Sequence, residues 1–123
     1  MNGSEFDSNA SLGRVLMIEF FDCKEGTRSL TDAAELYSSH HELTVVGVSL
    51  DDSLDRTVVF AAGRGAKFPV LFDPKREVAA RLDVTAPGTS LAVDRRGILR
   101  WIGDVSNPQA VQQAAAALLG ESA

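Results

Sequence analysis

The chain contains one cysteine, Cys23, among its 123 residues, and this thiol offers the widest range of chemistry. A single cysteine excludes a disulfide within the chain and a zinc site built from paired thiolates. If Cys23 lies between a strand and the following helix, the free N–H groups and dipole of that helix favour the thiolate, and Lys24 adds a positive neighbour. The alternative is an unreactive thiol that packs as a small apolar side chain. Only monothiol chemistry is open, because a mixed disulfide at Cys23 needs an outside thiol to release it.

Glu19 is the second candidate, because it interrupts an apolar run over residues 15–21 that is typical of a strand buried on both faces. A carboxyl group in such a place is expected to have a raised pKa, which suits a proton donor or acceptor near a thiol. The alternative is a carboxylate on an exposed or ion-paired rim. Glu19 has the catalytic role only if Cys23 is reactive.

The elements that must position these residues start with the strand over residues 15–21. A helix over residues 27–39 follows, and Thr27 is its predicted N-cap. Residues 43–50 are rich in β-branched side chains and predict a second strand. Residues 51–53 are good N-caps for a second helix that runs to about Gly63. This half of the chain is therefore a βαβα unit with short connections.

A short insert comes next. Residues 68–72 predict an extended piece, and a short helix over residues 76–82 is expected to start at Asp73-Pro74, with the proline in its first turn. The insert adds one further β and one further α element before the last part of the chain.

The last part has a different pattern. Residues 90–93 and 98–102 are predicted to pair as an antiparallel hairpin, because the turn between them ends in Gly97, which suits a left-handed backbone. Asn107-Pro108 opens a final helix, a cap followed by a proline, and Gly120 ends it. The complete order is βαβα, a short β and α, then ββα.

This order resembles the thioredoxin fold, an α/β architecture with a central mixed sheet flanked by helices. Four segments resemble thioredoxin-like redoxins of the TlpA/ResA type and their relatives, the alkyl hydroperoxide reductase and thiol-specific antioxidant proteins. They are GRVLMIEFF (residues 13–21), VVGVSLD (45–51), FPVLFDP (68–74) and TSLAVDRRG (89–97). The third segment, continuing to residue 84, is the insert that distinguishes this branch from simpler thioredoxins.

The resemblance also implies site residues. Cys23 falls on the first cysteine of the family's C-x-x-C pair, and Gly26 falls on the second. Gly26 also occupies the place of the peroxidatic cysteine of peroxiredoxins, so a typical peroxiredoxin is disfavoured. The family's cis-proline aligns with Gly88, and Pro87 comes one position earlier. With Phe21 and Lys24, these residues form the surface expected to bind a substrate or a partner.

Composition limits the remaining possibilities. The hydrophobic fraction of 45% and charged fraction of 24% are those of an ordinary soluble globular domain. The net charge of −5 is the wrong sign for binding nucleic acid, and no apolar run reaches the roughly 20 residues of a membrane span. Asp51 and Asp52 are explained as caps more simply than as a cation site, so no metal and no cofactor is expected.

Residues 1–12 are expected to be a flexible tail, in part a cloning remnant, followed by one domain over residues 13–120. The segment has no basic or apolar signal region, so a cytoplasmic location is expected, unless an export signal has been trimmed away.

Two functions follow from these residues. The first is a monothiol thiol-disulfide oxidoreductase or redox sensor, in which Cys23 exchanges with a small thiol or with a protein thiol or disulfide. The alternative is a catalytically inactive thioredoxin-fold module that binds a protein partner through the surface around Phe21, Cys23 and Pro87. The sequence leaves both open, and whether the protein is an enzyme is undecided.

Overall fold

The computed structural model describes residues 13–23, 33–36, 38–40, 42–65, 67–104 and 108–121. Residues 33–36 and 38–39 are helical, in agreement with the predicted first helix, whose start at Thr27 lies outside the described residues. Lys24, Gly26 and the predicted tail also lie outside them. The division of the chain into residues 1–12 and 13–120 therefore stays a prediction.

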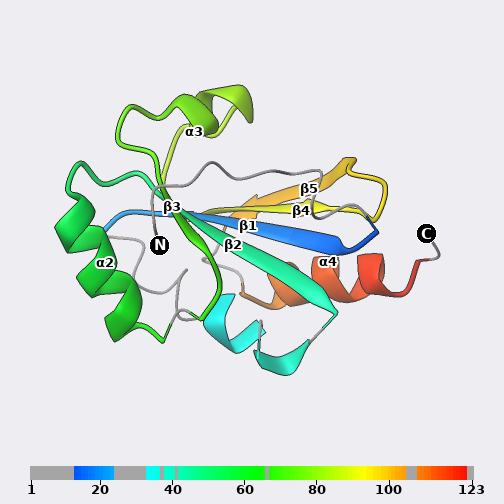
Figure 1. The fold of residues 1–123 in the computed structure, drawn as a ribbon. Coiled ribbons are helices and arrows are strands. Elements are labelled where there is room, and N and C mark those ends of the chain that lie inside the picture. The colour runs from blue at the N-terminus through cyan, green and yellow to red at the C-terminus, as the bar shows by residue number, and fades with distance from the viewer. Residues whose placement is uncertain are drawn as a thin grey trace.

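A five-stranded mixed sheet forms the centre of the molecule (Figure 1). The strands are β1 (Val15–Phe21), β2 (Leu43–Ser49), β3 (Val70–Phe72), β4 (Thr89–Val93) and β5 (Leu99–Asp104), in the spatial order β3-β2-β1-β4-β5. β1 pairs in parallel with β2, and β2 with β3, while β4 is antiparallel to both β1 and β5. The predicted mixed sheet is confirmed.

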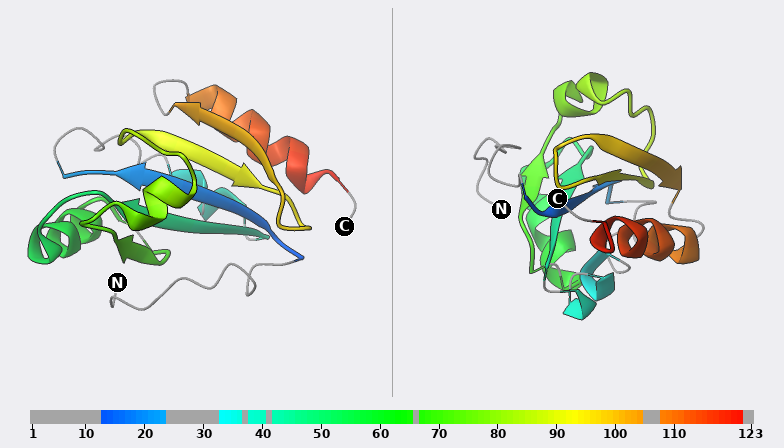
Figure 2. Two further views of the ribbon diagram at one scale, coloured as in Figure 1. Left: turned by 90° about the horizontal axis from the view of Figure 1, so that it is seen from above. Right: turned by 90° about the vertical axis from the view of Figure 1, so that its right-hand side faces the viewer.

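All seven residues of β1 are buried, because the sheet is covered on both faces. One face packs against α2 (Leu54–Gly63), α4 (Pro108–Leu119) and the helical residues 33–36, and the other packs against α3 (Glu77–Arg81). Figure 2 shows α3 and α4 on opposite sides of the sheet. Val15, Met17 and Phe21 face the first side, so Glu19 also points there, since alternate residues of a strand share a face.

Helix α2 begins as the sequence predicts. Ser53 is the N-cap, and its hydroxyl accepts a hydrogen bond from the Arg56 N–H. Helix α4 and the hairpin turn are also confirmed, and Gly97 has a φ of 83°, in the left-handed region. The turn is closed by the Gly97 N–H, which donates to the Asp94 carbonyl.

The predicted start of α3 is wrong. The helix begins at Glu77 instead of Asp73-Pro74, and Arg76 before it has a φ of 57°. The carboxylate of Asp73, only 5% exposed, accepts hydrogen bonds from the N–H groups of Glu77 and Ala79 at 2.8 and 3.1 Å. Asp73 therefore caps the helix from a position outside it. The residues between Asp73 and Glu77 form a non-helical turn.

We expect Asp73→Ala to lower the free energy of unfolding by about 1–2 kcal/mol, because α3 loses its cap and several helix N–H groups lose their acceptor. Urea unfolding followed by circular dichroism measures the loss. Lys75→Ala, an exposed change in the same turn, is the control, and equal stability of the two variants would contradict the capping role.

Candidate functional site

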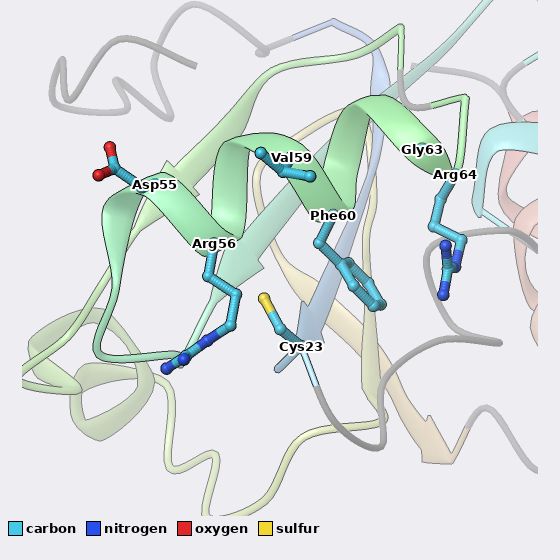
Figure 3. A pocket seen from close by; sticks show the side chains of 7 residues that line it. All are labelled: Cys23, Asp55, Arg56, Val59, Phe60, Gly63 and Arg64. Carbon is cyan, nitrogen blue, oxygen red and sulfur yellow. The ribbon is translucent and has the colours of Figure 1, made fainter.

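Cys23 lies two residues beyond the end of the central strand β1 and is a free, half-buried thiol. Its sulfur points toward the side of α2, between Arg56 and Phe60 (Figure 3). The expected place at the end of a central strand is therefore found. The start of the next helix, which was expected to face the sulfur, lies outside the described residues.

A hollow of about 530 Å³ opens at this sulfur, and we call it the Cys23 hollow. Its lining residues are Cys23, Asp55, Arg56, Val59, Phe60, Gly63 and Arg64. Six of the seven come from α2 or its C-cap, so the hollow runs along the helix (Figure 3).

Phe21 fixes the hollow without lining it. Its ring stacks on that of Phe60, with centroids 5.9 Å apart and planes 14° apart. The guanidinium of Arg64 lies over the Phe60 ring, 4.4 Å from its centroid. Phe21 is 0% exposed, so it supports Phe60 from below rather than offering a surface to a partner.

The surroundings of Cys23 raise the pKa of its thiol, first through burial and then through the negative charge of Asp51, with a smaller contribution from Asp22. A hydrogen bond from the Thr57 side chain and the positive charge of Arg56 act in the opposite direction but do not prevail. The expected lowering of the thiol pKa is therefore wrong, because a buried sulfur beside a carboxylate disfavours the thiolate.

Arg56 is held by two carboxylates. Its Nε lies 2.9 Å from Asp51 Oδ2, and its Nη2 lies 2.7 Å from Asp52 Oδ1. Burial alone raises the pKa of Asp51, but the bonds from Arg56 and the Ser53 N–H lower it overall. Asp51 and Asp52 thus anchor an arginine, and no group of three His, Cys, Asp or Glu side chains in the described ranges could hold a metal ion.

Thr57 and Ser49 form a buried hydroxyl pair beside the thiol. Both are 0% exposed, their side-chain oxygens lie 2.8 Å apart, and the Thr57 hydroxyl donates to the Ser53 carbonyl at 2.9 Å. Because a threonine hydroxyl has one proton, Thr57 favours the Cys23 thiolate by donating to the sulfur in place of the Ser53 carbonyl.

Glu19 is buried at 1% exposure, so the alternative of an exposed rim is wrong. Its Oε1 accepts a hydrogen bond from the Ser90 hydroxyl at 2.5 Å. The residues directly opposite on the neighbouring strands are Gly47, which has no side chain, and Ser90, which has a small one, so the carboxyl group has room. Glu19 does not line the Cys23 hollow.

Pro87 and Gly88 lie in the loop before β4, and the Gly88 N–H donates to the Phe20 carbonyl at 2.7 Å. This bond places the loop beside the end of β1. No described peptide bond is cis, so the Ala86–Pro87 bond is trans. Neither residue lines the Cys23 hollow.

The residues that the sequence analysis missed are Arg56, Thr57, Phe60 and Arg64. Arg56, Phe60 and Arg64 are spaced four residues apart, which places them in one row along a helix. This spacing was a usable signal for a surface on α2. What the spacing could not show is that the row faces the cysteine.

A family of known proteins and several solved structures match this chain. The sequence profile of the AhpC/TSA family matches residues 2–102. A search of curated proteins gave no match. Among solved structures, a protein of Chlorobium tepidum described as the thiol:disulfide interchange protein DsbE is 26% identical, with a TM-score of 0.82, over 91% of this chain and 84% of that one.

Two further structures are similar. A secreted Mycobacterium tuberculosis disulfide oxidoreductase is 15% identical, with a TM-score of 0.81, over 92% of this chain and 88% of its own. A thiol-disulfide isomerase of Corynebacterium glutamicum is 19% identical, with a TM-score of 0.76, over 98% and 90%. The predicted thioredoxin fold and the resemblance to thioredoxin-like redoxins are confirmed.

Two observations bear on the location of the protein in the cell. The helices in the described part of the chain fall short of the length and apolarity needed to span a membrane. One of the similar structures is of a secreted protein, so the cytoplasmic location stays a prediction.

The raised pKa of the Cys23 thiol can be tested by the pH dependence of its alkylation. We expect the rate of alkylation by iodoacetamide to rise with pH around a midpoint above that of an ordinary cysteine. Asp51→Asn is expected to lower this midpoint by removing a negative charge, whereas Thr57→Val is expected to raise it by removing the hydroxyl donor.

Asp83→Asn, the same change on an exposed residue outside the hollow, is the control for Asp51→Asn, and Thr57→Ser should restore the wild-type midpoint. A midpoint that moves in the same direction for Asp51→Asn and Thr57→Val would contradict this account of the thiol.

Proposed function

This chain belongs to the AhpC/TSA family, and from that premise we propose that it is a monothiol redox protein in which Cys23 exchanges disulfides with an external thiol. One observation carries the proposal: the only cysteine of the chain lies half-buried in an open hollow at the end of the central strand. The similarity to structures of disulfide oxidoreductases supports the same chemistry.

The exchange proceeds in two balanced steps. The Cys23 thiolate attacks one sulfur of an external disulfide, so an S–S bond to Cys23 forms while the original S–S bond breaks. The second sulfur leaves as a thiolate with the electron pair and takes a proton from water, so that Cys23 is oxidised and the disulfide is reduced. An external thiolate then attacks the mixed disulfide and releases Cys23 in its reduced form.

The raised pKa of Cys23 affects both steps, because it lowers the fraction of thiolate that attacks the disulfide and slows the release of the adduct. A thiol of high pKa is a poor leaving group, so the mixed disulfide at Cys23 is released slowly. A long-lived adduct suits a sensor, which must remain modified, better than an enzyme of rapid turnover. Within the monothiol proposal, the surroundings of Cys23 therefore favour redox sensing.

The alternative function is a binding module without catalysis. Helix α2 exposes three apolar side chains, with Leu54 at 46%, Val58 at 45% and Val59 at 73% exposure. Exposed apolar side chains that lie close together are typical of a protein interface. Such binding would survive Cys23→Ser unchanged, whereas disulfide exchange requires the sulfur.

We expect the wild-type protein to form a mixed disulfide with glutathione disulfide at a stoichiometry of one per chain, because it has one thiol. Mass spectrometry measures the adduct, and Cys23→Ser should form none. Release by reduced glutathione should be slower than release from a small mixed disulfide of an ordinary thiol. Absence of the adduct across pH 6–10 would overturn the monothiol function.

Glu19 is proposed as the group that holds or moves a proton for this exchange, because it is a buried carboxyl on the strand that leads to Cys23. Glu19→Gln keeps the shape of the side chain and is expected to slow the exchange by about tenfold or more. It should also change the pH profile of the rate. Ser90→Ala, which keeps the carboxyl group, is the control, and an unchanged profile in Glu19→Gln would show a structural role only.

A further inference from the structure

A buried pair of hydroxyl groups connects the end of β2 with the side of α2 next to Cys23. Ser49 is the last residue of β2, Thr57 lies in the first turn of α2, and both side chains are 0% exposed. Their oxygens lie 2.8 Å apart, within hydrogen-bond distance. Because buried polar groups take their partners from within the protein, the direction of each hydrogen bond here follows from the donors and acceptors that surround the pair.

The neighbouring groups fix the direction of the bond between the two hydroxyls. The Thr57 hydroxyl donates its one proton to the Ser53 carbonyl at 2.9 Å, since a carbonyl oxygen can only accept. The Ser49 oxygen accepts a hydrogen bond from the Asp51 N–H at 3.2 Å. Because the Thr57 proton is in use, the proton between the two hydroxyl oxygens belongs to Ser49. Ser49 therefore donates to Thr57.

This direction leaves Thr57 with one proton and two acceptors that it can reach. The Cys23 sulfur points toward the side of α2 between Arg56 and Phe60 (Figure 3). Thr57 follows Arg56 and is three residues before Phe60, so it lies beside both on the helix surface. When Cys23 ionises, the Thr57 hydroxyl turns from the Ser53 carbonyl to the sulfur. The Ser53 carbonyl keeps a partner, because it also accepts from the Thr57 N–H at 3.1 Å.

The Ser49 hydroxyl acts in both states of the thiol. The Thr57 oxygen can accept from Ser49 whichever way its own proton points, so this bond does not break when Cys23 ionises. Hydrogen bonds in a chain polarise one another, so a hydroxyl that accepts one bond is a stronger donor for the next. The Ser49 proton also occupies the space between the two oxygens, which keeps the Thr57 proton on the side away from β2.

We propose that Ser49 is a positioning residue for the Cys23 thiol: by donating to Thr57, it directs the single Thr57 proton toward the sulfur and so favours the thiolate. Ser49 acts through Thr57. This inference rests on the proposed function, because the thiolate it concerns is the one that attacks a disulfide in the exchange written above. Alkylation of Cys23 tests the positioning role without any disulfide, so its failure and the failure of the exchange can be distinguished.

Ser49 has a second route to the thiol, through Asp51. The Asp51 N–H donates to the Ser49 hydroxyl, and the negative charge of Asp51 disfavours the Cys23 thiolate. Loss of the Ser49 hydroxyl can therefore change the thiol by moving this carboxylate. A single variant does not separate the two routes, because both change the pH midpoint of alkylation. A double-mutant cycle separates them, because only the proposed route passes through the Thr57 hydroxyl.

The test compares the pH midpoint of iodoacetamide alkylation in the wild type, Ser49→Ala, Thr57→Val and the double variant. We expect Thr57→Val to raise the midpoint by about 1 pH unit and Ser49→Ala by about 0.3, because the first loses a hydrogen bond to a charged sulfur and the second only its reinforcement. In the Thr57→Val background, Ser49→Ala should leave the midpoint unchanged. Thr44→Val, which removes a β2 hydroxyl that accepts from Arg14 instead, is the control and should keep the wild-type midpoint.

An equal shift from Ser49→Ala with and without the Thr57 hydroxyl would assign the effect to Asp51 and overturn the proposal, as would an unchanged or lowered midpoint in Ser49→Ala. A second measurement uses the unchanged protein labelled with ¹³C. In its nuclear magnetic resonance spectrum, the hydroxyl proton between the two oxygens should couple to the Cβ of Ser49, and coupling to the Cβ of Thr57 would overturn the proposal. If the cycle gives the expected shifts but Cys23 forms no glutathione adduct, the positioning role stands and the monothiol function fails.

Discussion

The stack between Phe21 and Phe60 determines where the thiol lies. Phe21 is the last residue of β1, and its carbonyl accepts a hydrogen bond from the Leu50 N–H at 2.7 Å, which ties it to the end of the neighbouring strand. Its ring then fixes Phe60 on α2, and Phe60 in turn carries Arg64. Cys23 follows only two residues later, so its sulfur lies against α2. The side chains along that face of α2 therefore form the wall of its hollow.

The charges at this place differ from what a rapid dithiol enzyme needs. The positive charge of Arg56 lowers the pKa of the Cys23 thiol, but Arg56 is shared between two carboxylates. Burial of the thiol and the negative charge of Asp51 raise the pKa by more than Arg56 lowers it. A dithiol site benefits from a low pKa, because its second thiol must displace the first quickly. With no second cysteine in the chain, that advantage is absent, and a slow leaving group prolongs the only adduct that this chain can form.

Much of the fold could be predicted because local patterns and tertiary packing agree. The apolar run of β1 matches burial on both faces, and Ser53 and Pro108 mark the starts of α2 and α4. The start of α3 could not be predicted, because Asp73 caps it from outside the helix. The direction of the Cys23 pKa shift could not be predicted either, because it depends first on the burial of the thiol and then on Asp51, which the sequence identified only as a cap.

The remaining question is why the surface beside the only cysteine departs from what stability alone would select. Elsewhere, costly features have structural partners: the Arg95 guanidinium, for example, donates to the Leu119 carbonyl at the end of α4. Gly63 and Val59 have no such structural partner. Gly63 lacks a side chain although the fold has room for one, and Val59 exposes an apolar side chain. Natural sequences tend to break local rules at functional sites, where stability is given up for binding. Both departures lie in the same hollow as the thiol, where cover of the exposed Val59 side chain by another molecule would recover part of the stability that they cost.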